Sequence, residues 1–220
     1  MLNFNGLQFQ WTGHDGFRIV DNNSKKTIYI DPFRLTNTQK SRSDADIVLI
    51  SHNHYDHLSL EDLRPLVKRH TSIISARECT EQLKDLQTDS LKVLKPGEKI
   101  TVKEVLIEAV PAYNTNKKFH PKQDEKIGFV ITLNGHRIYH AGDTDIIPEM
   151  QSFNPDIALI PVSGTYVMTA QEAAKAVNEI IKPKKLAIPM HYGAIIGSED
   201  DARTFRDLVK VCQVEILQSE

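Results

Sequence analysis

The stretch SHNHYDH, residues 51–57, directly follows the apolar run DIVLI at residues 46–50. A continuous apolar run of this length predicts a strand that is buried on both faces. The stretch after it places three imidazoles and one carboxylate at the end of that strand: His52, His54, Asp56 and His57. Neutral imidazole nitrogens and carboxylate oxygens suit Zn²⁺, and also Mn²⁺ or Fe²⁺. Grouping so many imidazoles without a ligand is costly, so the stretch predicts a metal site rather than a histidine-rich polar loop.

The spacing within this stretch divides the ligands between two ions. His52 and His54 are two residues apart, so both side chains can point the same way and share one ion. Asp56 and His57 follow a turn and can bind a second ion beside the first. The sequence therefore predicts two divalent metal ions, with zinc favoured and manganese or iron as alternatives.

Two more candidate ligands stand at the ends of other predicted strands. Asp143 lies in the segment HAGDT, where Gly142 permits a tight turn, and its carboxylate can bridge two ions. His191 follows the apolar run KLAIPM at residues 185–190. Taken alone, Asp143 also fits a turn or cap residue, and His191 also fits a buried core histidine. Their occurrence together with the 51–57 stretch favours metal binding by both.

The whole-chain composition excludes several classes of protein. The chain has 220 residues and a net charge of −2, from 27 Lys and Arg against 29 Asp and Glu, which argues against a strongly basic nucleic-acid-binding protein. Cys79 and Cys212 form no CxxC pair, so a disulfide-stapled secreted module is disfavoured. We find neither a signal-peptide pattern nor an apolar run of about 18 residues, which predicts a cytoplasmic globular protein without membrane association.

Strand-like segments occur in both halves of the chain. Strands are predicted at residues 7–11, 17–20, 27–30, 46–50, 91–94, 99–102, 104–110, 127–133, 137–141, 156–162, 185–191 and 214–217. The DNNS segment predicts a hairpin turn after the second of these strands, and KPGE predicts a turn before residue 99. Asn134-Gly135 is the strongest short hairpin signal in the chain.

Helical segments separate some of these strands. Helices are predicted near residues 60–70 and 77–87, at 169–181, and after residue 198. Pro65 indicates that the first of them starts late or is kinked, and Thr169 with Glu172 forms a capping box for the third. The order shows no regular βαβ alternation, no GxGxxG and no P-loop, which disfavours a doubly wound sheet. An α+β fold with a sheet-on-sheet core covered by helices is predicted instead.

In this combination of motifs the chain resembles the metallo-β-lactamase superfamily. The matching segments are HxHxDH at residues 52–57, GDT with Asp143, PMHYG with His191 and an early IDP at residues 30–32, and they span nearly the whole chain. The resemblance implies an αββα sandwich in a single domain over residues 1–220, with two mixed sheets flanked by helices and two pseudo-symmetric halves of about 1–110 and 111–220. WTGHDGF, YHAGDTD and PMHYG are similar to a branch of small stand-alone hydrolases that includes ascorbate-6-phosphate lactonase.

The resemblance also implies a third histidine on the first ion, between HxHxDH and Asp143. The predicted strand EVLIEAVPAYN ends in Asn114, where many relatives carry a histidine, and His120 in KKFHPK is the only histidine between Asn114 and the next predicted strand at residue 127. We therefore expect His120 to be the ligand, with Asn114 or a water as the alternative. The lysines around it form either a solvated loop or a lip that steers an anionic substrate: Lys117, Lys118 and Lys122.

Other residues are candidates for contact with a ligand or with the substrate: His14, Asp31, Asn114, His140, Ser163, Tyr166 and Tyr192. His14 matches the family's early GH turn and lies either at the mouth of the site or in a structural turn. Asp31 is either a carboxylate that fixes the tautomer of a ligand histidine or a turn residue before a proline. Ser163 and Tyr166 belong to a loop on the predicted rim, and they either touch the substrate or pack the rim.

The predicted chemistry is metal-dependent hydrolysis of a small molecule. Two ions bridged by Asp143 and a hydroxide provide a nucleophile at neutral pH, because metal binding lowers the pKa of water to roughly 7. The hydroxide attacks the carbon or phosphorus of an ester, lactone or phosphoester, and the ions stabilise the developing oxyanion. Asp56 is the predicted catalytic residue, because it can orient the hydroxide and receive its proton.

Other functions remain open at this point. A metal-binding interaction protein without catalytic activity would have the same metal ligands as a hydrolase. A di-iron oxidoreductase of the same fold is disfavoured, because the resemblance implies a glutamate where this chain has His54. The 29 residues after His191 are too few for the helical substrate domain of glyoxalase II, and the chain lacks the long insertion of the family's RNA nucleases. An oligomer is compatible with the sequence, and nucleic acid is disfavoured as a partner.

Overall fold

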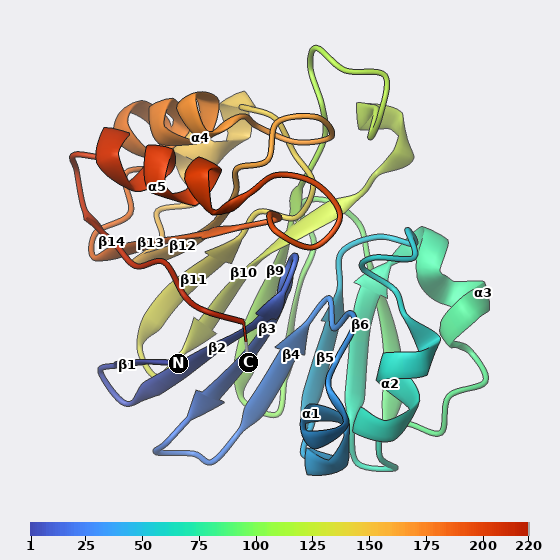
Figure 1. The fold of residues 1–220 in the computed structure, drawn as a ribbon. Helices are drawn as coiled ribbons and strands as arrows, with labels where there is room; N and C mark the ends of the chain where they lie inside the picture. The colour runs from blue at the N-terminus through green and yellow to red at the C-terminus, as the bar shows by residue number, and fades with distance from the viewer. Residues whose placement is uncertain (220) are drawn as a thin grey trace. The chain divides into compact units, whose positions relative to one another are not determined.

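The strands of the protein collect into two sheets, each formed from one continuous part of the chain (Figure 1). In the computed structural model, which describes residues 1–219, each of two compact units contains one seven-stranded sheet. Unit 1 is Met1–Lys95 with the described end of the chain from Gln218, and unit 2 is Pro96–Leu217. The predicted α+β class with two mixed sheets is confirmed.

Unit 1 contains a sheet in the order β1-β2-β3-β4-β5-β6-β7. Its strands are β1 (Leu2–Phe4), β2 (Leu7–Gly13), β3 (Gly16–Asp21), β4 (Thr27–Ile30), β5 (Ile47–Ile50), β6 (Ser72–Ala76) and β7 (Ser90–Leu94). The first four strands pair antiparallel, and β4 to β7 pair parallel. The connections between the parallel strands contain α1 (Asn37–Arg42), α2 (Leu60–Leu66), the 3-10 turn η1 (Arg77–Cys79) and α3 (Thr80–Leu83).

Unit 2 repeats this topology with its own strands, in the order β14-β13-β12-β11-β10-β9-β8. The strands are β8 (Lys99–Val102), β9 (Val105–Pro111), β10 (Ile127–Leu133), β11 (His136–His140), β12 (Ile157–Pro161), β13 (Leu186–Met190) and β14 (Gln213–Val214). Strands β8 to β11 pair antiparallel, and β11 to β14 pair parallel. Helices α4 (Ala170–Ala176) and α5 (Glu199–Leu208) pack against each other, on β12 and β13 respectively. The remaining turns are η2 (Lys122–Asp124), η3 (Pro148–Ser152) and the π-helical η4 (Val177–Ile181).

The repeat begins earlier than the predicted boundary near residue 110. The KPGE segment connects β7 in one sheet to β8 in the other, and β8 pairs with β9. Strand β9 therefore belongs to the second sheet. The sequence pattern gave a turn at KPGE but no sign of which sheet each flanking strand would join.

Several local predictions are confirmed. Strand β5 is fully buried between parallel neighbours, as the DIVLI run predicts, and so is β12. Asn134 and Gly135 turn between β10 and β11 with φ of +48° and +74°, which is the left-handed backbone that a tight hairpin requires. Thr169 and Glu172 form the predicted capping box of α4.

Other local predictions are wrong or incomplete. Helix α2 begins at Leu60, capped by the Ser59 side chain, and ends one residue after Pro65, so the proline marks its end and not a late start. The last strand is Gln213–Val214 and does not extend to residue 217. Two short strands and one short α-helix were missed: β1, β6 and α1. Each is six residues or fewer, which gives little periodicity to detect.

The ends of the parallel strands position the candidate ligands of each unit. In unit 1, Asp31 follows β4 and the 51–57 stretch follows β5, its parallel neighbour. In unit 2, Asp143 and His191 follow β11 and β13. Parallel strands bring their carboxyl ends to one edge of a sheet, so the residues of each unit gather there.

None of the helices in residues 1–219 combines the length and apolar character that crossing a bilayer requires.

Candidate metal centre

The loop after β5 turns His52 and His54 toward each other. Nε2 of His52 lies 3.0 Å from Nδ1 of His54, so these two nitrogens can serve one ion. The other nitrogen of His52, Nδ1, lies 2.9 Å from the hydroxyl of Ser51. Between the two histidines, the backbone N–H of Asn53 donates to the Glu78 carboxylate at 3.0 Å. The loop is thus fixed by its own backbone and by a side chain from η1.

Asp31 fixes the orientation of His57 from the end of the neighbouring strand. Its Oδ1 accepts the Ser51 backbone N–H at 2.8 Å, and its Oδ2 accepts the Ser51 hydroxyl and lies 2.8 Å from Nδ1 of His57. Both side chains are fully buried. A carboxylate at Nδ1 favours the tautomer with the proton on that nitrogen, which leaves Nε2 as the donor for a metal.

Asp56 lies beside His14 in the same unit. Oδ2 of Asp56 is 3.0 Å from Nε2 of His14 and 3.9 Å from Nε2 of His57. His14 is buried in a left-handed turn with φ of +52°, and its carbonyl accepts the Trp11 indole N–H at 2.8 Å. The structure therefore places His14, a predicted neighbour of the site, against a predicted ligand.

Three further residues of this cluster were not predicted from the sequence: Asp15, Ser51 and Glu78. Asp15 is fully buried, with its Oδ2 3.8 Å from Nδ1 of His57, and its carboxylate lies in one group with the carboxylate of Asp31 and the imidazole of His57. Ser51 and Glu78 hold the histidine loop, as described above. The GHDG turn was visible in the sequence. An acidic residue between turn residues usually faces solvent, so only its burial separates Asp15 from an ordinary turn residue.

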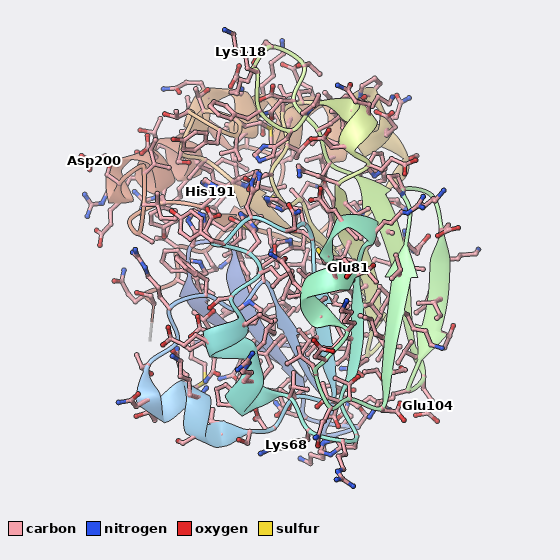
Figure 2. The ribbon with its side chains drawn as sticks, turned by 90° about the vertical axis from the view of Figure 1, so that its right-hand side faces the viewer. Lys68, Glu81, Glu104, Lys118, His191 and Asp200 are labelled. Carbon is pink, nitrogen blue, oxygen red and sulfur yellow. The ribbon has the colours of Figure 1, made fainter. Side chains whose placement is uncertain are left out.

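In unit 2, Asp143 lies between two imidazoles. Its Oδ2 is 3.4 Å from Nε2 of His120, and its Oδ1 is 3.3 Å from Nε2 of His191. All three side chains are buried. His191 directly follows β13 and is labelled in Figure 2; its Nδ1 lies 2.7 Å from the Ser163 hydroxyl. Ser163 therefore orients His191 so that Nε2 faces the carboxylate.

Asn114 holds the loop that carries His120. Its backbone N–H donates to the carbonyl of His120 at 2.8 Å, and its side-chain Nδ2 donates to the carbonyl of Tyr166 at 2.8 Å. The same Nδ2 lies 3.4 Å from Nδ1 of His120. Of the two residues considered for the third histidine position, His120 faces Asp143 and Asn114 closes the loop behind it.

The remaining candidates of unit 2 take different positions. Nδ1 of His140 accepts the Gly142 backbone N–H at 3.3 Å, which steadies the turn that leads into Asp143. The Tyr192 hydroxyl donates to the carbonyl of Leu217 at 3.5 Å. Burial raises the pKa of Tyr192 to about 12, so it stays protonated at neutral pH.

The lysines around His120 differ in their contacts. Lys117 forms an ion pair with Asp145, and Lys122 forms one with Glu149 at 2.9 Å. Lys118 is exposed at the tip of the loop between β9 and β10 (Figure 2). Of the three lysines predicted to steer an anionic substrate, Lys117 and Lys122 instead pair with carboxylates of their own unit. Lys118 is the one that is left for this role.

The spacing of several donor atoms suits a bound divalent metal ion. Two ligands that bind one ion tetrahedrally through bonds of about 2.0–2.1 Å have donor atoms about 3.4 Å apart. The distances from Asp143 to His120 and to His191 are 3.4 and 3.3 Å, and His52 and His54 approach to 3.0 Å. On two of these histidines the other nitrogen contacts a serine hydroxyl that can accept its N–H, as ligand histidines require: His52 and His191.

Residues 8–191 match the family model described as the beta-lactamase superfamily domain. The chain belongs to the metallo-β-lactamase superfamily. Among its relatives is a UPF0173 metal-dependent hydrolase of Thermoplasma acidophilum, 33% identical over 92% of this chain and 90% of the relative. A UPF0173 metal-dependent hydrolase of Thermococcus onnurineus is 32% identical over 92% of both chains.

Solved structures agree with this membership. A protein from Parabacteroides distasonis is 34% identical, with a TM-score of 0.82 over 96% of this chain and 94% of that one. A metallo hydrolase from Ignicoccus hospitalis is 26% identical, with a TM-score of 0.78 over 97% and 95%. The metallo-β-lactamase fold and the family resemblance read from HxHxDH, GDT and PMHYG are therefore confirmed.

Proposed function

We propose that this metallo-β-lactamase superfamily member is a metal-dependent hydrolase that cleaves an ester, lactone or phosphoester bond of a small molecule. The relatives named above are called metal-dependent hydrolases, which supports the general class. The proposed zinc ligands of unit 1 are His52, His54, Asp56 and His57, and those of unit 2 are His120, Asp143 and His191. The observation that carries the proposal is the pair of distances from the two Asp143 oxygens to different imidazoles, which suits a bridging carboxylate.

The residues of unit 1 divide into ligands, a base and positioning groups. A bound divalent ion lowers the pKa of water to about 7 and stabilises negative charge on the reacting oxygen. Asp56 is the proposed general base, and His14 at 3.0 Å holds its carboxylate in place. Asp31 keeps His57 in the tautomer that offers Nε2. The cytoplasmic location and the small-molecule substrate remain predictions from composition and motifs.

A metal-binding protein without catalysis would share these contacts, so the test must measure turnover. Metal-free protein is assayed on chromogenic esters, lactones and phosphodiesters before and after addition of Zn²⁺ or Mn²⁺. We expect activity only with metal, a loss of at least about 100-fold in His57→Ala, and no loss in His70→Ala, which removes an exposed histidine after α2. Metal binding without turnover of any substrate would favour the non-catalytic alternative, and activity of the metal-free protein would overturn the mechanism.

A further inference from the structure

An exposed aromatic ring adjoins the His120 side of unit 2. Phe119 is 48% exposed, and it directly precedes His120 in the chain. Its ring packs edge-to-face on Tyr166, with ring centroids 4.8 Å apart and planes at 82°. Tyr166 belongs to the loop that also carries Ser163, the partner of His191. The two rings therefore lie on the loops that position both histidines of Asp143.

The loop that presents Phe119 is held at its base by polar contacts. The Asn114 N–H donates to the carbonyl of His120 across the neck of the loop at 2.8 Å. The buried carboxylate of Asp145 accepts the Thr115 N–H at 2.9 Å and pairs with Lys117. These contacts fix the backbone on the N-terminal side of Phe119. The ring is thus held in place before any ligand arrives, which reduces the entropy lost on binding.

The side chain of Asn114 connects the aromatic pair to the proposed ligand. Its Nδ2 donates to the Tyr166 carbonyl at 2.8 Å and lies 3.4 Å from Nδ1 of His120. Phe119 is thus one residue from His120 along the chain, and the Asn114 side chain joins the His120 ring to the backbone of Tyr166, which carries the partner ring.

Unit 1 shows the same combination independently. Tyr55 is 66% exposed between His54 and Asp56, and its ring packs on Phe33 at 5.8 Å. Among the residues that the structure describes, Tyr55 and Phe119 are the most exposed aromatic side chains. Single exposed apolar residues are common on protein surfaces. Here, each of these rings adjoins a proposed ligand in sequence and is supported by a second ring.

We propose that the Phe119–Tyr166 pair binds an apolar group, preferably an aryl group, on the substrate, and so selects hydrolysable compounds with such a substituent. This inference rests on the proposed function for the position of the reacting bond. Aromatic rings contribute apolar area and prefer edge-to-face or offset contact with another ring. A ring that projects 48% into solvent beside a supporting ring offers that contact to a ligand.

The test compares two probes that differ only in the apolar group. Binding of benzylphosphonate and of methylphosphonate to the zinc-loaded protein is measured by calorimetry, after metal content has been determined for each variant. We expect the benzyl compound to bind roughly tenfold tighter. Phe119→Ala should remove most of that preference and leave methylphosphonate binding within about twofold, while Phe119→Leu should retain part of it. Val211→Ala, which truncates another exposed side chain of unit 2, should change neither affinity.

The outcomes separate this inference from the proposed function. Equal binding of the two phosphonates by the wild type, no binding of either, or an unchanged preference in Phe119→Ala would overturn the inference. An equal loss for both probes would mean that Phe119 acts through His120, and would also overturn it. A lost preference in Phe119→Ala would support the inference even if no substrate is turned over, whereas absent turnover bears on the proposed function alone. Thermal unfolding of each variant checks that it folds.

Discussion

Replacing Asp31 by asparagine should reverse the tautomers of two proposed ligands. A single arrangement of protons satisfies the network in the wild type: Nδ1–H of His57 and the Ser51 hydroxyl both donate to Oδ2 of Asp31, and Nδ1–H of His52 donates to the Ser51 oxygen. Both histidines then offer Nε2 to a metal. In Asp31→Asn, the amide oxygen can keep the Ser51 backbone N–H, but an NH₂ group replaces Oδ2.

The NH₂ group can only donate, so each partner of Oδ2 must become an acceptor. His57 has to present a lone pair at Nδ1 and carry its proton on Nε2, the atom proposed to bind metal. Ser51 accepts from the amide and turns its own proton toward His52. The lost interaction is a fully buried, charge-assisted hydrogen bond of 2.8 Å, worth about 1.5–3 kcal/mol. This corresponds to a drop in zinc affinity of about 10- to 100-fold.

Zinc affinity is measured by competition with a chelator, and the protonated nitrogen of His57 is identified by two-bond ¹H–¹⁵N NMR spectra of the metal-free protein. Asp156→Asn is the matched control, because the Asp156 carboxylate also accepts a backbone N–H, that of Arg137 at 2.9 Å, but adjoins no proposed ligand. The control should bind zinc like the wild type. The reasoning is refuted if Asp31→Asn binds zinc within twofold of the wild type, or if its His57 keeps the proton on Nδ1.

Three further predictions concern unit 2. Ser163→Ala removes the 2.7 Å partner of His191 and should lower zinc affinity about tenfold, whereas Ser163→Thr should retain it; equal affinities by chelator competition would contradict this. Gly128→Ala would bring a Cβ within 2.6 Å of backbone oxygens at the end of β11, so urea unfolding should show a loss of at least about 1–3 kcal/mol. Burial opposes ionisation of Glu149, but hydrogen bonds, the first of them from Lys122, outweigh it and lower the pKa below 4.5. This surface ion pair stabilises the wild type relative to Glu149→Gln by less than about 1 kcal/mol. The stabilisation is present above pH 4.5 and is lost as the pH falls through the lowered pKa of Glu149. A melting-temperature difference between the two proteins that is the same at pH 7 and at pH 3 would contradict this.

The candidate site was predicted largely from local signals. HxHxDH, GDT and PMHYG each follow an apolar run, and a strand end is where a sheet presents polar side chains together. The buried runs of β5 and β12 and the Asn134-Gly135 turn were predicted for the same reason, since backbone preference and periodicity act over a few residues. The choice of His120 as a candidate ligand came from the family resemblance and the lack of another histidine between Asn114 and residue 127.

The tertiary structure decided which residues support these candidates. Asp31 meets His57, 26 residues later, because β4 and β5 are parallel neighbours, and no local pattern encodes that pairing. Asp15 looked like an ordinary turn residue until its burial was known. The sequence by itself determined the ligand types and their positions at strand ends, since these follow from short-range chemistry. Strand order, burial and the proton network around Asp31 depend on contacts between distant segments, and only the folded chain defines them.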